Sequence, residues 1–371
     1  MLAAIANARS EVLVQTFIWQ EDRIGTEFAA CLIAAASRGV SVQATVDGYG
    51  TPEFSKDFLS ALQDSGVRIR VFDPQSTLFR IRTNFFCRLH QKIVVIDGST
   101  GFVGGINICD DHLRDYGKGS KQDYALEVSG PVVSQIREYV YRHGQSRNGP
   151  WWRNWRYWLR LFPRELKDPG ASAQVLFATR DNSQHPTDIE TLYRIAIRNA
   201  TREIVIANAY FFPGYRFVRD LLNARRRGVR VKLILQGNPD RPVSIGLASI
   251  LYDDLASAGV EIYQYTERPL HAKVAVVDDN WATVGSSNLD PTSLGLNYEA
   301  NLFVLDRAFN RNLHRKLSEL IDYSCEKFSP RGYRASRLRT LLTGIVYHLT
   351  RRMTTWGRRA VRRKQRAQPP N

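Results

Sequence analysis

The sequence predicts an α/β protein built from two similar domains, each a mixed β-sheet flanked by helices. The first observation behind this fold class is a long-range repeat, in which His90–Asp97 (HQKIVVID) recurs as His271–Asp278 (HAKVAVVD). The second is the alternation, in each half, of short β-rich runs with helical patterns that end at glycine. A length of 371 residues also fits two domains better than one. We therefore expect two halves related by pseudo-two-fold symmetry, with one site between them.

The repeat extends well beyond a single motif. The segment Gly104–Asn107 (GGIN) matches Gly285–Asn288 (GSSN) at the same offset of 181 residues as the first motif. A flanking match pairs Arg38–Val40 (RGV) with Arg227–Val229 (RGV), at an offset of 189. Because all matches keep the same order along the chain, they indicate a duplicated domain.

We expect the same succession of elements in both halves. Helical patterns at Ala29–Ser37 and Phe58–Asp64 each precede a glycine that ends the helix. A β-rich run at Ala173–Phe177 has no counterpart ahead of Met1. Strands are expected at Val12–Trp19, Val40–Asp47, Val67–Phe72 and Lys92–Ile96, and again at Ile204–Tyr210, Val229–Gln236, Val260–Tyr265 and Lys273–Val277.

The positive charge is distributed unevenly along the chain and marks a separate C-terminal segment. The net charge is +16, and residues 331–371 hold twelve Lys or Arg and no acidic residue, so subtracting the twelve leaves +4 for the rest. Apolar residues recur at helical spacing in this tail, and tryptophans alternate with arginines in the segment between the halves. We expect domains at 1–146 and 173–330, a Trp/Arg-rich connector at 147–172 and a basic amphipathic membrane-associating tail at 331–371.

The position of the charge favours an anionic phospholipid membrane over nucleic acid as the partner, because the excess lies on an apolar-striped tail and not on the body. No stretch approaches the ~18 apolar residues that span a bilayer, and the start lacks the pattern of a secretory leader, so we expect peripheral contact. The four cysteines are scattered and are expected to be free thiols. The oligomeric state is left open.

The repeated His-x-Lys motif is suited to phosphodiester chemistry. Alternation along a strand places His90 and Lys92 on one face, and His271 and Lys273 likewise. One neutral imidazole can attack phosphorus while the opposite imidazole protonates the leaving alcohol. The lysines can then hold the developing charge on the phosphate oxygens. We expect the two His-Lys pairs to face each other in one site.

Further candidates accompany the motifs. Asp123 and Glu299 follow the two motifs by 33 and 28 residues in matching contexts, and we expect them to orient the histidines. Asp97 and Asp278 belong to the repeated signature, but their position before a turn favours a capping role over direct chemistry. The turns that follow offer phosphate contacts from Asn107, Asn288, Gly105 and Ser286. Five histidines without a repeated partner are interpreted as bystanders, namely His112, His143, His185, His314 and His348. No metal or other cofactor is expected, since the sequence shows no cluster of His, Asp and Glu.

The doubled H-x-K-x4-D-x6-G-[GS]-x-N pattern resembles the signature of the phospholipase D superfamily. Over residues 1–330 the chain is similar to bacterial cardiolipin synthases, closest to the cardiolipin synthase B group. The segments that carry the likeness are Thr16–Trp19, Asp47–Gly50, Lys121–Ala125, Asn208–Tyr215 and Trp281–Pro291. One departure from the generic pattern is Gly105, which stands where serine is usual.

The resemblance implies transfer of a phosphatidyl group from one phosphatidylglycerol to another, giving cardiolipin and glycerol through a phosphohistidine. It implies a peripheral location at the cytoplasmic face of the bacterial inner membrane. It favours His90 as nucleophile and His271 as acid–base, although the near-symmetric motifs leave that choice open. Hydrolysis, and transfer with other lipids such as phosphatidylethanolamine, are left as alternatives. A superfamily nuclease is less favoured because the body is only mildly basic.

Overall fold

The computed structural model describes residues 1–74, 77–78, 81–82, 87–144, 173–237 and 251–329. The predicted connector at 147–172 and tail at 331–371 lie outside these residues, so the four-part division of the chain stays a prediction. No helix within the described ranges combines the length and apolarity needed to cross a bilayer.

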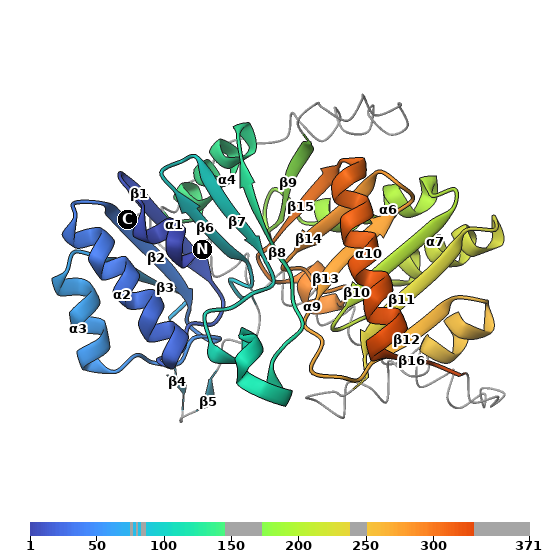
Figure 1. Cartoon of the computed structure of the whole chain (residues 1–371), viewed down its shortest axis with the longest axis horizontal. Helices are drawn as coiled ribbons and strands as arrows, with labels where there is room; N and C mark the ends of the chain where they lie inside the picture. Colours follow the sequence, from blue (N-terminus) through green and yellow to red (C-terminus); the bar gives the residue numbers. More distant parts are fainter. Residues whose placement is uncertain (75–76, 79–80, 83–86, 145–172, 238–250, 330–371) are drawn as a thin grey trace.

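Two mixed sheets lie side by side, the first in blue to green and the second in green to red (Figure 1). The first sheet has the strand order β3-β2-β1-β6-β7-β8. Its strands are β1 (Glu11–Thr16), β2 (Ser41–Asp47), β3 (Arg68–Phe72), β6 (Lys92–Ile96), β7 (Thr100–Gly104) and β8 (Ala125–Ser129). A separate two-stranded ribbon joins β4 (Thr77–Leu78) to β5 (Ile81–Arg82).

The second sheet repeats this order and adds a strand at each edge, as β16-β12-β11-β10-β13-β14-β15-β9. In both sheets three parallel strands precede an antiparallel strand that carries the His-x-Lys lysine. The strands are β9 (Gln174–Arg180), β10 (Glu203–Asn208), β11 (Arg230–Gln236), β12 (Glu261–Tyr265), β13 (Lys273–Val277), β14 (Trp281–Gly285), β15 (Glu299–Leu305) and β16 (Cys325–Lys327). The predicted α/β class with two similar halves is confirmed.

Helices cover the sheets because their apolar faces pack on the β-branched strands. One face of the first sheet is covered by α1 (Leu2–Ala6) and α2 (Arg23–Ser37), with α3 (Lys56–Asp64) beside them. Its other face packs on α4 (Pro131–Gly144), and this core continues into the second half through Ala300 and Leu302. That shared core fixes the two halves against each other. The second sheet is covered by α6 (Asp188–Asn199) and α7 (Tyr215–Arg226) on one face and by α10 (Arg307–Ser324) on the other.

The observed strands agree with those predicted to within one or two residues, with two exceptions. The strand expected at Ala173–Phe177 continues to Arg180. The strand expected over Val12–Trp19 ends at Thr16. The reason is Trp19, which is fully buried and donates its indole hydrogen to the Gly25 carbonyl at 3.1 Å. The following helix starts earlier than predicted, at Arg23, because Asp22 caps it by accepting from the Gly25 amide at 2.9 Å.

β9 is the strand predicted without a first-half counterpart. It lies at the edge of the second sheet, antiparallel to β15. Among the described residues, β8 pairs with β7 alone and holds the corresponding edge of the first sheet. The two sheets of the described residues therefore differ at this edge.

Candidate active site

Each motif histidine is held by backbone bonds to the opposite half. The His90 amide donates to the Tyr298 carbonyl at 3.0 Å, and the Tyr298 amide donates to the Arg88 carbonyl at 2.8 Å. In the same way, the His271 amide donates to the Gln122 carbonyl at 2.8 Å. These bonds belong to two isolated parallel bridges, Leu89–Tyr298 and Gln122–Leu270. The bridges place both His-Lys pairs at the contact between the two halves, here called the seam.

The orienting carboxylates also cross the seam. His90 Nδ1 lies 2.9 and 3.0 Å from the two oxygens of Glu299, which belongs to the second half. His271 Nδ1 lies 2.6 Å from Oδ2 of Asp123, which belongs to the first half. Each buried carboxylate accepts an Nδ1 hydrogen and so fixes the tautomer that leaves Nε2 with a free lone pair. Both predicted carboxylates therefore lie beside a histidine, but each beside that of the other half.

Burial disfavours the charged form of both imidazoles. It lowers the pKa of His90 to about 4, against the opposing pull of Glu299. Burial, together with the charges of Lys273 and Lys92, holds the pKa of His271 well below its usual value. A neutral imidazole with an exposed lone pair can act as a nucleophile or accept a proton.

The two lysines are buried with the histidines. Lys92 is 5% exposed and Lys273 is fully buried, and each donates from Nζ to the carbonyl of the histidine two residues before it. Burial lowers the pKa of Lys92 to about 7 and that of Lys273 to about 8, with Glu299 and Asp123 opposing the shift. An anionic phosphate placed between the lysines would favour their charged forms.

Two polar residues that the sequence interpretation missed, one buried and one partly buried, hold the backbone just before each motif histidine. The Leu89 amide donates to Asp47 at 2.7 Å, and the Leu270 amide donates to Gln236 at 2.9 Å. Asp47 and Gln236 end corresponding strands at the 189-residue offset already seen for the Arg-Gly-Val match. That shared offset is the signal that could have identified them. Both fix the residue that precedes a motif histidine.

The turns after the motifs lie against the carboxylates. A Cβ on Gly105 would stand 2.3 Å from Oδ1 of Asp123, so only glycine fits there. Ser286 Oγ instead donates to Oε2 of Glu299 at 2.5 Å. Asn107 and Asn288 are each 5% exposed, and in both the Oδ1 atom is buried without a hydrogen-bond partner. Such orphaned polar atoms suit a polar ligand, and phosphate contact by these four residues stays a prediction.

The signature aspartates lie at the far ends of their strands from the histidines. Asp97 accepts hydrogen bonds from the amides of Arg9, Ser10 and Glu11 at 2.7–3.1 Å. Asp278 does the same for residues 201–203, at 2.8–3.0 Å. Their φ values of 52° and 49° place both in the left-handed region that short polar side chains tolerate at turns. This geometry is that of a structural cap.

His112, interpreted from sequence as a bystander, belongs to the site. It ends a short 3-10 helix (Asp110–His112), its side chain is 2% exposed, and its ring packs edge-on against His271 at 5.2 Å. His112, Asp123 and His271 have ligating atoms within 4.8 Å of one another, and so do Cys109, Asp111 and His112. The group of His112, Asp123 and His271 escaped the sequence interpretation because its members come from both halves. Cys109, Asp111 and His112 lie within four consecutive residues, but the missing repeat partner of His112 led to its interpretation as a bystander.

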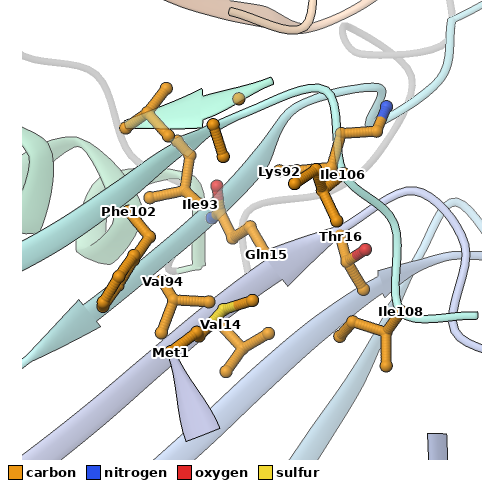
Figure 2. A pocket seen from close by; sticks show the side chains of 13 residues that line it. Met1, Val14, Gln15, Thr16, Lys92, Ile93, Val94, Phe102, Ile106 and Ile108 are labelled. Atoms are coloured by element: carbon orange, nitrogen blue, oxygen red, sulfur yellow. The ribbon is translucent and has the colours of Figure 1, made fainter. Parts of the chain in front are cut away.

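A small hollow lies between Met1 and Lys92, lined by Val14, Phe102 and other apolar residues (Figure 2). In Figure 2 the amine of Lys92 points away from Val14 and Met1. With room for about one water, this hollow does not accommodate a lipid head group.

Comparison with known proteins agrees with this geometry. A family model described as "Cardiolipin synthase, PLD-like domain" matches residues 1–140 and 193–321. The chain belongs to the phospholipase D-like cardiolipin synthase family. It is thus a phosphatidyltransferase, which confirms the resemblance on which the sequence interpretation drew.

Individual relatives support the assignment. The cardiolipin synthase B of Shigella flexneri is 47% identical over 326 residues, covering 87% of this chain and 78% of the relative, and that of Escherichia coli K12 matches equally well. A cardiolipin synthase A of Pseudomonas putida F1 is 32% identical over 334 residues, covering 88% of this chain and 66% of the relative.

Solved structures share the fold at low identity. The phosphatidylserine synthase of Haemophilus influenzae has a TM-score of 0.68 at 16% identity, covering 95% of this chain and 91% of that one. The polyphosphate kinase of Porphyromonas gingivalis has a TM-score of 0.59 at 15% identity, covering 95% of this chain and 50% of the other. These likenesses show the two-half architecture alone.

Proposed function

We propose that this cardiolipin synthase family member moves a phosphatidyl group from one phosphatidylglycerol to a second, releasing glycerol and forming cardiolipin. The observation that carries the proposal is the pair of buried imidazoles, each fixed at Nδ1 by a carboxylate of the opposite half. The 47% identity to enzymes named cardiolipin synthase B supports the choice of reaction.

In the first step Nε2 of His90 attacks the phosphorus of the diester. A P–N bond forms, the bond from phosphorus to the head-group glycerol oxygen breaks, and His271 in its protonated form gives its Nε2 proton to that oxygen. Lys92 and Lys273 stabilise the charge on the non-bridging oxygens. Glycerol leaves, and a phosphatidyl-histidine remains.

In the second step a head-group hydroxyl of another phosphatidylglycerol attacks the phosphohistidine. His271, now neutral, takes the hydroxyl proton while the P–N bond breaks and releases His90. Cardiolipin is the product, and His271 is again protonated for the next turnover. The overall exchange of one P–O bond for another leaves both imidazoles as they began.

The surroundings of the two rings support the choice of His90 as nucleophile. His90 contacts both oxygens of Glu299 and packs edge-on against Phe17 at 4.9 Å, which holds the ring in place through both steps. His271 contacts one oxygen of Asp123 and packs against the ring of His112. A ring that must first donate a proton and later accept one is suited to the surroundings of His271.

The substrate lies in a membrane, so we propose peripheral association with anionic phospholipid, rich in phosphatidylglycerol and cardiolipin, at the cytoplasmic face of the bacterial inner membrane. The basic residues at 331–371 and the Trp/Arg alternation at 147–172 support this proposal from the sequence. Each cation near an anionic surface contributes about 1 kcal/mol to binding.

The reaction is tested by incubating the purified protein with phosphatidylglycerol vesicles and identifying the products by mass spectrometry. Cardiolipin and glycerol in equal amounts are expected. Phosphatidic acid with glycerol and no cardiolipin would show that water is the acceptor and would replace the proposal with hydrolysis. Vesicles containing phosphatidylethanolamine as the sole donor, with free glycerol added, define the donor and acceptor range in the same assay.

A further inference from the structure

The two orienting carboxylates are supported in different ways. Glu299 accepts a second hydrogen bond, from Ser286 Oγ at 2.5 Å. The repeat-related position of Ser286 is Gly105, where a side chain would collide with Asp123. Asp123 therefore lacks the hydroxyl that its counterpart has. The side chain that faces it instead is His112, whose Nδ1 lies 3.7 Å from Asp123 Oδ2.

His112 makes two further contacts within the site. Its ring packs edge-on against His271, with an interplanar angle of 82°. Its Nε2 lies 3.4 Å from Nδ2 of Asn107. The residue at the repeat-related position in the second half is Ser293, which has no ring to play this part. His112 therefore packs against His271, and the repeat provides no equivalent histidine for His90.

The contacts of His112 define one consistent arrangement of hydrogens. A hydrogen bond from the Asn107 amide to Nε2 places the single proton of neutral His112 on Nδ1. The N–H of Nδ1, and not a lone pair, then faces the Asp123 carboxylate. Asp123 already accepts hydrogens from His271 and from the Tyr124 amide, which lies 2.8 Å from Oδ1. His112 Nδ1, at 3.7 Å from Oδ2, is too distant to donate a further hydrogen bond, but its N–H dipole attracts the carboxylate and contributes to keeping Asp123 in place.

The carboxylate pKa shifts agree with this difference in support. Burial raises the pKa of Asp123 in spite of the nearby Lys273 and His112. Burial acts in the same direction on Glu299, but the charge and hydrogen bond of His90, with Lys92 and Ser286, outweigh it and lower the pKa. The charged form of Asp123 is therefore less well stabilised than that of Glu299.

We propose that His112 is a positioning residue, which holds Asp123 and Asn107 in register with His271 and thereby sets His271 apart from His90 as the proton-transferring imidazole. The inference rests on the proposed phosphatidyl transfer for its kinetic consequence. Its structural content, the effect of His112 on the His271–Asp123 pair, is independent of the substrate.

Loss of the His112 nitrogens should raise the pKa of His271. The N–H dipole of His112 would no longer draw on the charge of Asp123, so the carboxylate would stabilise the charged form of His271 more strongly. The charged or titratable groups that face His271 are Asp123, Lys273, Lys92, Lys121, His90 and His112. Those that face His112 are His271, Asp123, Lys121, Asp111 and Cys109.

The test uses His112→Phe, which keeps a ring against His271 and removes both nitrogens, and His112→Asn, whose amide can replace the donor near Nδ1. Ser293→Ala at the repeat-related position is the matched control. With phosphatidylglycerol vesicles, His112→Phe should lower kcat by about 10- to 100-fold, as loss of supporting contacts does elsewhere. KM should change less than kcat, and the His271-dependent limb of the pH profile should move upward. His112→Asn should recover most of kcat, and Ser293→Ala should behave as wild type.

A second measurement needs no substrate. In protein labelled with 15N at histidine, the Nδ1 hydrogen that His271 donates to Asp123 is followed by NMR and assigned by its loss in His271→Gln. His112→Phe should shift it, with the thermal unfolding temperature checked in parallel. Unchanged kcat, pH profile and His271 resonance in His112→Phe would overturn the inference. A shifted resonance in a protein that makes no cardiolipin would keep the inference and reject the proposed function instead.

Discussion

His271 donates its Nδ1 hydrogen to Asp123 across the seam between the halves, over 2.6 Å. The reciprocal pair, His90 with Glu299, crosses in the other direction. Neither half therefore holds a complete histidine–carboxylate pair, although each holds a complete motif. A single half that folded alone would present an imidazole without its orienting acceptor.

Asp123→Asn and Glu299→Gln should each lower kcat by about 10²- to 10⁴-fold, because an amide can stabilise the wrong tautomer of the histidine and cannot stabilise its charged form. Initial rates of cardiolipin formation measure the effect. Glu127→Gln, at an exposed position on β8, is the control and should retain full activity. Wild-type rates in either site variant would contradict the role of that carboxylate.

His90→Ala and His271→Ala should each abolish transfer from phosphatidylglycerol, because one shared site needs both rings. A phosphatidyl donor with a nitrophenol leaving group separates their roles, since such a group needs no proton to depart. His271→Ala should then form a trapped phosphatidyl-enzyme that intact-mass analysis detects, whereas His90→Ala should form none. The opposite pattern would make His271 the nucleophile.

Activity should fall on the alkaline side of neutrality. The pKa values of Lys92 and Lys273 are lowered by burial to about 7 and about 8, and both lysines must carry a proton to stabilise the phosphate oxygens. Raising the pH through this range removes those protons, so kcat/KM, which reports the free enzyme, should drop by about tenfold per pH unit for each proton lost. Vesicle binding is measured at each pH as the control. A profile that stays flat to pH 9.5 would refute the assignment.

Asp97→Ala and Asp278→Ala should reduce stability by about 1–3 kcal/mol each, since each leaves a cluster of backbone amides without its charged acceptor. Burial alone would raise the pKa of Asp97, but the amides of Ser10, Glu11 and Arg9 outweigh it and lower the pKa. The stabilisation is therefore present above the unfolded-state pKa of about 3.9 and is lost as the pH falls through the lower folded value. Denaturant unfolding measures the loss. Activity per folded molecule, assayed well below the midpoint, should remain; its disappearance would indicate direct chemistry.

Deletion of residues 331–371 should weaken binding to anionic vesicles, because twelve positive charges leave with the segment. Sedimentation with phosphatidylglycerol vesicles measures the change, and vesicles of neutral phosphatidylcholine give the reference. The circular dichroism spectrum and unfolding temperature of the remaining protein should change little. Equal sedimentation of the full-length and shortened chains would remove the tail as an anchor.

Local pattern was enough to predict much of the fold and part of the site. The two-residue period of a strand placed His90 with Lys92, and the 181-residue offset identified His271 and Lys273 as their equals. The apolar runs that follow are buried at every position, as expected for central strands. The end of β1 was mispredicted because the burial of Trp19 depends on a contact with Gly25 that no strand pattern encodes.

The sequence by itself determined that this protein has two similar halves, each with one His-x-Lys motif and one acidic residue in a matching context. Its information is periodic and local, so it specifies strands, their faces and the repeat. Only the tertiary structure decided that Asp123 serves His271, that Glu299 serves His90, and that His112 joins the first of these pairs. Those contacts depend on how two separate sheets pack across the seam, and residues 148 or 209 positions apart meet there because the shared core and the backbone bridges hold the halves in register.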